Sequence, residues 1–415
     1  MKQKTIKFLV ISSLLPLVVS FFIASPFEIF NGMTRIITES SVLITDYIAI
    51  GGLGAALFNV GILTLMAIII IYISGAAING TAIASVYLMG SFAFFGKNVF
   101  NVVPILLGTF LYSKLTKKDY RDIVHMSLLA TSFAPIVTEI ILFVPLSDPL
   151  RTIAGIVVGM SVGFVIKPVA DNLFKVHEGF NLYNTGFSIG IIATLYVSIM
   201  KSYGYEPRQR LILDVGHTEA FAYILATLFI VMFVAGFLGN NRSLKSYWKL
   251  LKETGYQHND FLENFGLSTV LMNMGINGIL CLVYVLFIAK GELNGPIMGG
   301  ILTVVGFSGL GKHARNILPI FIGVVLGGLT KSWTLDQPTI LFAALFGTAL
   351  APIAGYFGFA WGIVASFINS SVVLNSGQLH SGMNLYNTGF SVGIVASVLV
   401  PILKKIKNKE ISIEI

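Results

Sequence analysis

A thirteen-residue segment rich in polar side chains occurs twice in this chain, with a spacing of 203 residues. Gly179–Ile191 reads GFNLYNTGFSIGI and Gly382–Ile394 reads GMNLYNTGFSVGI, so eleven of the thirteen positions are identical. Chance similarity between apolar stretches repeats leucine and valine, but not an ordered series of Asn, Tyr, Thr and Gly. The sequence therefore indicates an internal duplication.

A second set of matches extends the duplication toward the N-terminus. Asn59-Val-Gly-Ile answers Asn273-Met-Gly-Ile, and at a shift of 215 residues a block that begins at Asn79-Gly80 answers one that begins at Asn294-Gly295. The later pairs at that shift are Phe92/Phe307, Gly96/Gly311, Lys97/Lys312, Asn101/Asn316, Pro104/Pro319, Ile105/Ile320 and Gly108/Gly323.

The composition places these repeats in a membrane. The 415 residues are 55% hydrophobic and 11% charged, with a mean hydropathy of +0.85, whereas soluble domains carry about 25% charged residues. The net charge of +8 comes from short basic loops between apolar runs, which is typical of the cytoplasmic loops of membrane proteins and not of nucleic-acid binding. The single cysteine, Cys281, excludes an intrachain disulfide and a cysteine-based metal site.

The apolar runs predict an all-α polytopic membrane protein of about 12–14 spans, at about 20 residues per span. We expect the first run, residues 6–25, to be a retained helix and not a cleaved signal. Runs 79–95, 99–114, 295–310 and 314–330 are short, so each pair could form a hairpin that enters and leaves on one face.

The two repeats are predicted to be inverted. Each holds six segments, and one helix near residues 216–238 lies between them, so the second repeat enters the membrane from the opposite face. Secondary transporters have this architecture, with the site where the repeats meet. The predicted organisation is an N-terminal helix and loop (1–45), repeat 1 (46–200), a linker with one helix (201–263), repeat 2 (264–403) and a basic cytoplasmic tail (404–415).

The duplicated polar motif is the strongest candidate for a solute site. Each unsatisfied polar group is costly in lipid, so this many amides and hydroxyls in eight residues suggests a broken helix that lines a site. The alternative is helix capping and interhelical hydrogen bonding. The candidate solute-binding residues are Asn181, Tyr183, Asn184, Thr185 and Ser188, with Asn384, Tyr386, Asn387, Thr388 and Ser391.

The Gly-Lys pairs form a second candidate. A lysine directly after glycine, between two short apolar segments, could present a positive charge and free N–H groups to an anion, or extend to lipid head groups. The residues concerned are Lys97 and Lys312, with Asn79, Asn294, Asn101 and Asn316.

Three lone ionisable residues are candidates for coupling transport to Na⁺ or H⁺. Glu139 lies within an apolar run, and its counterpart in the second repeat is Tyr356; His177 and His380 precede the two polar motifs. No phosphate-binding loop or hydrolase motif is present, so we expect no cofactor and no enzymatic activity. The alternative is a membrane-embedded enzyme acting on a lipid or isoprenoid with Glu139 and His177 or His380.

The duplicated Asn-Leu-Tyr-Asn-Thr-Gly-Phe-Ser motif and the Gly-Lys…Asn…Pro block resemble a family of bacterial two-repeat membrane proteins of unknown function. The arrangement is also similar to that of urea transporters, in architecture alone. Together these features predict a multi-pass protein of the cytoplasmic membrane, with both termini in the cytoplasm. We expect it to be a transporter or channel for a small polar or anionic solute. The expected partners are that solute and the lipid bilayer, not nucleic acid; self-association is left open.

Overall fold

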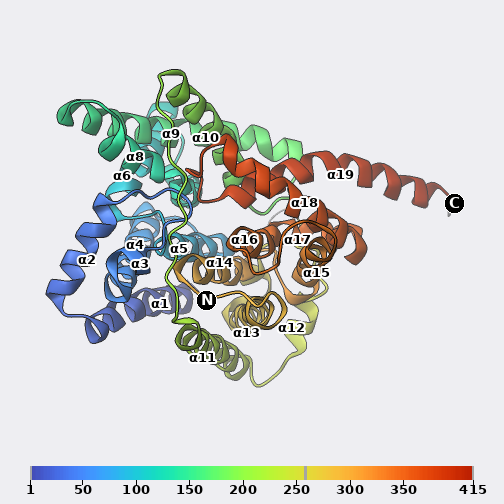
Figure 1. Cartoon of the computed structure of the whole chain (residues 1–415). Coiled ribbons are helices and arrows are strands. Elements are labelled where there is room, and N and C mark those ends of the chain that lie inside the picture. Colours follow the sequence, from blue (N-terminus) through green and yellow to red (C-terminus); the bar gives the residue numbers. More distant parts are fainter. Residues whose placement is uncertain (1, 257–258, 414–415) are drawn as a thin grey trace.

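Helices make up most of the described chain (Figure 1). The computed structural model describes residues 2–256 and 259–413, with side chains as far as residue 407. The longer helices of the first repeat are α1 (Lys2–Ile23), α2 (Pro26–Thr38), α4 (Leu53–Ser74), α5 (Gly80–Phe92), α6 (Val99–Thr116), α7 (Val124–Ala130), α8 (Pro135–Phe143), α9 (Asp148–His177) and α10 (Asn184–Ser202), with the short α3 (Tyr47–Gly51) before α4. Those of the second are α11 (Thr218–Gly239), α12 (Lys245–Leu250), α13 (Phe261–Val283), α14 (Gly295–Gly306), α15 (Ala314–Thr330), α16 (Pro338–Gly347), α17 (Ala351–Phe357), α18 (Phe359–Leu379) and α19 (Asn387–Ile413).

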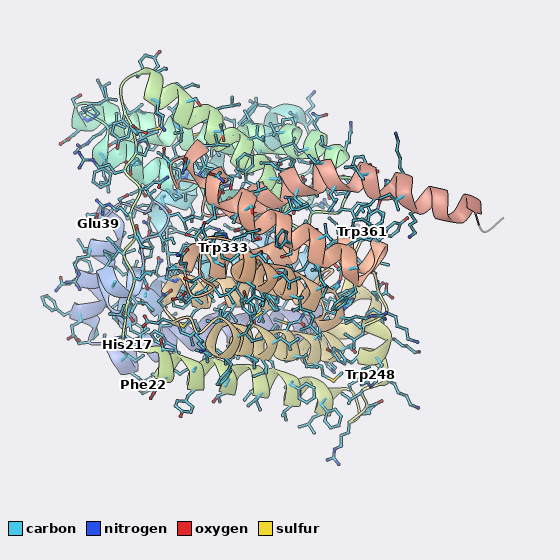
Figure 2. All side chains as sticks on the ribbon, turned by 45° about the vertical axis from the view of Figure 1, so that its right-hand side comes forward. Phe22, Glu39, His217, Trp248, Trp333 and Trp361 are labelled. Atoms are coloured by element: carbon cyan, nitrogen blue, oxygen red, sulfur yellow. The ribbon has the colours of Figure 1, made fainter. Side chains whose placement is uncertain are left out.

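The described chain is an all-α, multi-pass membrane protein. Ten of its helices are long and apolar enough to cross a bilayer, or eleven if α7 and α8, which meet at a 45° bend, form one span. Large apolar side chains cover the outside, among them Phe22 and Trp248, which lie at the lower edge of the molecule in Figure 2. Lipid is the solvent that such a surface requires.

Each repeat opens with the same antiparallel pair of helices. α1 packs against α4 through glycines: a Cβ at Gly61 would lie 2.7 Å from Leu17, and one at Gly54 would lie 2.5 Å from Ala24. α11 packs against α13 in the same way, with the α13 residue Gly275 against the backbone of Phe229. Helix α11, which the sequence places between the repeats, therefore packs against α13 in the same way as α1 packs against α4.

The short segments form hairpins, which was one of the two arrangements that the sequence allowed. α5 runs back along α4 and leads into the turn that holds Ala93 and Lys97. The carbonyls of these two residues accept hydrogen bonds from Asn59 Nδ2 of α4, both at 2.8 Å. The 18 residues of α6 then span about 27 Å back to the face where α5 began. His125, at the start of α7, bonds the carbonyl of Ala77, just before α5, at 3.0 Å. Both ends of hairpin α5–α6 therefore lie at one face.

Hairpin α14–α15 enters from the other face. α5 and α14 lie side by side and antiparallel at the centre of the bundle: Gly80 touches Gly309, and a Cβ at Gly299 would clash with the carbonyl of Ser91. We call α5 and α14 the half-helices. The start of each half-helix is thus level with the tip of the opposite hairpin. This contact makes the two repeats inverted, as the sequence predicted.

The basic loops gather at one face. Helix lengths and hairpins place the N-terminus, the loop after α6, helix α12 and the basic end of α19 together, and Lys404 of α19 pairs with Glu178 at the end of α9. We call this the basic face; it corresponds to the face predicted to be cytoplasmic. The opposite face carries residues 203–217, an irregular connection from α10 to α11 that runs down the molecule in green in Figure 1 and that we call the strap.

Candidate functional site

Two lysines sit at the hairpin tips, each with no exposed surface. Lys312 Nζ donates hydrogen bonds to Thr348 Oγ1 at 2.7 Å and to the Tyr183 hydroxyl. It also lies over two aromatic rings, 4.3 Å from the centroid of Tyr183 and 5.1 Å from that of Phe307. A cation over a ring gains about 0.5–2 kcal/mol, which offsets part of the cost of burial. Lys312 is thus held without a carboxylate.

Lys97 occupies the equivalent place with fewer partners. Its Nζ lies 5.0 Å from the centroid of Phe92 and 3.7 Å from Met89 Sδ, a weak acceptor that also takes the Thr131 hydroxyl at 3.2 Å. No ion pair joins either lysine to a carboxylate among the described residues. Buried ionisable groups are ordinarily paired, so two buried lysines without a carboxylate partner in a membrane protein mark this region as a functional candidate.

Aromatic rings connect the two lysines across the centre. Tyr183 and Tyr386, equivalent positions in the two polar motifs, lie 4.5 Å apart between ring centroids. Tyr183 continues to Phe307 at 4.6 Å, and Tyr386 continues to Phe92 at 5.2 Å. The row Lys97–Phe92–Tyr386–Tyr183–Phe307–Lys312 therefore passes through the crossing point of the repeats, and we call it the aromatic row.

Helices α10 and α19 both begin at this row. Gly186 and Gly389 allow the two helix starts to meet, because a Cβ at Gly186 would lie 2.9 Å from the Tyr386 ring and one at Gly389 would lie 3.2 Å from Gly186 Cα. The backbone N–H of Leu182 donates to the carbonyl of Ala349, and that of Leu385 to Ser132, both at 3.1 Å. Each polar motif is thus anchored on the opposite repeat.

The amides of the polar motifs bond mostly to nearby protein groups. His177 Nε2 lies 2.9 Å from Asn184 Oδ1, whose amide nitrogen donates to the carbonyl of Ala170. His380 and Asn387 repeat this at 3.0 Å. Asn181 and Asn384 each accept the N–H two residues ahead, at 2.8 and 2.9 Å, and Ser188 and Ser391 bond back along their helices. These side chains shape the backbone that presents the tyrosines, which agrees with the capping alternative for the amides.

The remaining predicted residues also fix the backbone. Asn101 Nδ2 donates to Gly96 O and Asn316 Nδ2 to Gly311 O, both at 2.9 Å, so they close the turns that carry the lysines. Asn79 and Asn294 cap α5 and α14, each accepting an N–H at 3.1 Å. Thr185 is buried at the start of α10, and Thr388 lines a small cavity described below.

The half-helix N-termini are occupied by carboxylates from the opposite repeat. Asp46 Oδ2 accepts the N–H of Gly295 at 3.0 Å, and Asp260 Oδ2 accepts that of Gly80 at 2.8 Å. Asp46 also accepts the N–H of Ile48 and of Asp214 in the strap. A helix N-terminus attracts an anion, and here the protein supplies it. We call Asp46 and Asp260 the reciprocal caps; their burial raises both pKa values, that of Asp46 to about 6.

The family model for proteins of unknown function designated DUF1576 matches residues 25–202 and 239–405. These ranges cover both repeats and most of the chain. The chain belongs to the DUF1576 family. No curated protein and no solved structure matches it.

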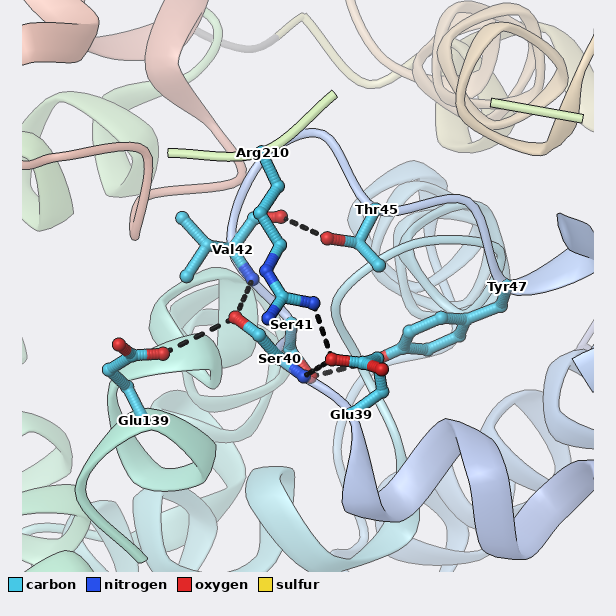
Figure 3. Close-up of polar contacts among 8 residues, drawn as sticks. All are labelled: Glu39, Ser40, Ser41, Val42, Thr45, Tyr47, Glu139 and Arg210. Carbon is cyan, nitrogen blue, oxygen red and sulfur yellow. Dashed lines mark hydrogen bonds and ion pairs between the residues drawn. The ribbon is translucent and has the colours of Figure 1, made fainter. Parts of the chain in front are cut away.

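Glu139 of this DUF1576 protein lies close to Ser40 and to the strap, which carries Arg210 (Figure 3). It is 4% exposed and accepts hydrogen bonds from Tyr205 at 2.5 Å and from Ser40 at 3.3 Å. The neighbouring Glu39 pairs with Arg210 of the strap. Glu139 shares no hydrogen bond with His177 or His380, and among the described residues no group of three His, Cys, Asp or Glu could hold a metal. The three coupling candidates therefore belong to separate parts of the fold.

A buried cavity of about 30 Å³ adjoins the aromatic row through Phe346 and is also lined by Leu43, Ile44, Leu385, Asn387 and Thr388. This volume accommodates one or two water molecules. An open depression of about 740 Å³ lies on the strap face, lined by Lys201, residues 206–209, Gln378 and Ser381. Residues 39–46 lie beside both, because Leu43 bonds Gly382, next to Ser381, and Ile44 bonds Arg210, next to Gln209.

Sequence comparison of the two DUF1576 repeats could have found more of this site. Asn59 and Asn273, and likewise Phe92 and Phe307, are repeated positions, and their repetition is the signal that could have found them. Asp46 and Asp260 also recur at a shift of 214, yet a lone repeated Asp before a helix gives no sign of the opposite half-helix that it caps. Thr131 and Thr348 lie among apolar residues and are placed by folding alone.

Proposed function

We propose that this DUF1576 protein is a membrane transporter or channel for a small polar or anionic solute, with its site on the aromatic row between the inverted repeats. The observation that supports this proposal most is the pair of buried, unpaired lysines at the tips of two hairpins that enter from opposite faces. Ionisable groups inside a membrane protein are rare and mark solute or ion pathways.

The arrangement suits alternating access. Each hairpin tip lies level with the start of the opposite hairpin, so movement of one hairpin would open the row to one face while the other hairpin keeps it closed. The described state is closed at both faces: the lysines and the tyrosines of the row are buried, and the adjoining cavity has room for water only. Passage of a solute therefore requires a rearrangement from this state.

Solute entry into proteoliposomes tests the proposal. Vesicles containing the purified protein are mixed with formate, acetate, nitrate, urea or glycerol, and swelling is followed by light scattering. We expect faster swelling than in empty vesicles for at least one solute. The variant Tyr183→Phe/Tyr386→Phe keeps the rings but removes both hydroxyls, so the rate should fall by about tenfold, the value of one hydrogen bond to a charged group.

Tyr284→Phe is the matched control. Tyr284 is also a buried tyrosine, but it stacks on Phe321 at 4.6 Å, away from the aromatic row. Its variant should transport like the native protein. Swelling equal to that of empty vesicles for every solute, or equal rates in the two tyrosine variants, would contradict the proposal.

A further inference from the structure

Each hairpin tip carries a buried lysine with no carboxylate paired to it among the described residues. Lys312 has two hydroxyl acceptors and two ring faces, and Lys97 has a thioether and one ring face. An ammonium group has three donors and, out of water, costs several kcal/mol unless an opposite charge lies near it. Hydroxyls and rings offset this cost only in part.

Lys331 shows what a structural lysine looks like in the same protein. Its Nζ donates to Ser370 Oγ at 2.8 Å and to the carbonyl of Phe367 at 2.5 Å, and it lies 3.9 Å from the Phe367 ring centroid. It also keeps contact with solvent at the end of α15. Neither Lys97 nor Lys312 has a comparable carbonyl partner among the described residues.

We propose that the hairpin tips bind a small monovalent anion together with a proton, so that the transported species is the anion accompanied by H⁺. The proposal deepens the proposed function and rests on it. In the empty, closed site the lysine amine is favoured over the ammonium group, because no counter-charge is present. An incoming anion supplies that charge, and the amine takes up a proton from solution as the anion binds. No bond to carbon forms or breaks.

The surroundings favour a small, singly charged anion. The aromatic row and the adjoining cavity offer few donors, and a doubly charged ion such as sulfate needs many donors to replace its water. Chloride, nitrate, formate, acetate and thiocyanate are small anions with a single charge and are therefore candidates. The half-helix N-termini are excluded as anion sites, since the carboxylates of Asp46 and Asp260 already occupy them.

Linkage makes the proposal quantitative. If each bound anion brings one proton, its Kd rises about tenfold for every unit increase in pH above neutral. The other titratable groups beside Lys312 are the Tyr183 phenol and the Cys281 thiol, and beside Lys97 the row holds the Tyr386 phenol. All three are neutral near pH 7, so none releases or takes up a proton there.

Calorimetry on the purified full-length protein tests both parts. Each of the five anions, as its sodium salt, is titrated at pH 6, 7 and 8 in two buffers of different ionisation enthalpy, which gives the number of protons taken up. We expect at least one anion to bind with close to one proton per anion and with the tenfold slope. Lys97→Met/Lys312→Met should abolish binding, and Lys331→Met should leave it unchanged.

A second variant separates a lost charge from a lost fold. Lys97→Arg/Lys312→Arg carries guanidinium groups that stay protonated at every pH, so anions should bind with no proton uptake and no pH slope. Cys281→Ser should behave like the native protein. Failure of all five anions to bind, binding without proton uptake in the native protein, or binding that survives the double methionine change overturns the inference.

The outcomes also distinguish this inference from the proposed function. Swelling of vesicles in urea or glycerol without binding of any anion overturns the anion inference and leaves transport standing. Anion binding with proton uptake but no flux of any solute overturns the transport proposal.

Discussion

Asp46 gives the protein a pH-dependent stability that one substitution removes. Its carboxylate is fully buried and joins repeat 1, the strap and the start of α14 through three backbone N–H groups, of Ile48, Asp214 and Gly295. Burial disfavours the charged form more than these hydrogen bonds favour it, so its pKa rises from 3.8 to about 6. The folded protein therefore holds a proton on Asp46 at a pH where the unfolded chain has lost it.

The sign and size of the effect follow from linkage. Because the folded state binds the extra proton, Asp46 stabilises the fold below pH 4, and this contribution is lost as the pH rises through 6. At 1.36 kcal/mol per pKa unit, the rise from 3.8 to about 6 corresponds to about 3 kcal/mol. With an unfolding entropy of about 2.1 cal/mol/K per residue, a chain of 415 residues gains about 3 °C in Tm.

Thermal melting followed by tryptophan fluorescence checks this prediction. The protein in detergent is melted at several pH values from 7 to 4 beside Asp46→Asn, which cannot titrate. Other groups titrate in both proteins, so the difference between the two Tm profiles isolates Asp46. We expect the native profile to gain about 3 °C on the variant as the pH falls. Parallel profiles would refute the reasoning that burial outweighs the hydrogen bonds at Asp46.

Two further predictions concern the packing of the repeats and the strap. Gly393→Ala should lower the free energy of unfolding by about 1–3 kcal/mol, because its Cβ would overlap the Phe187 ring. Gly347→Ala is the control, since the nearest atom to its Cβ would be 3.4 Å away, and it should leave stability unchanged. Equal changes in Tm for the two variants would contradict this prediction. Glu139→Gln should speed amide hydrogen exchange at residues 203–217 by roughly tenfold, since the hydrogen bond from Tyr205 to a charged acceptor is lost. Mass spectrometry measures this exchange. An unchanged exchange rate would mean that this bond does not hold the strap.

The overall architecture could be predicted because duplication and hydropathy are properties of the sequence itself. The repeated motifs gave the two units, and the apolar runs gave the helices. The odd number of segments between equivalent points gave the inversion. The four short runs allowed both spans and hairpins, since length alone does not say where a chain turns. Asn59 and Asn273 fix the hairpin arrangement, because each donates its side-chain amide from a neighbouring helix to carbonyls of the turn that carries the lysine.

The candidate site could be predicted only in part. The motif Asn-Leu-Tyr-Asn-Thr lies at the centre of the fold, yet within it the sequence does not separate the tyrosines, which face the opposite repeat, from the amides, which bond mostly to nearby groups. A side chain of Asn suits a cap, a turn or a ligand equally well. Which of these it becomes depends on a neighbour such as His177 or Gly389, and that neighbour is fixed by tertiary packing.

The reciprocal caps bear on how such a protein is made. When the ribosome has synthesised only the first repeat, the N–H of Gly80 lacks its acceptor, because Asp260 has not yet been made. Asp46 at that stage lacks the N–H of Gly295 in the same way. Neither half can finish its own half-helix, so the nascent first repeat is an intermediate that must remain loosely assembled until the second arrives.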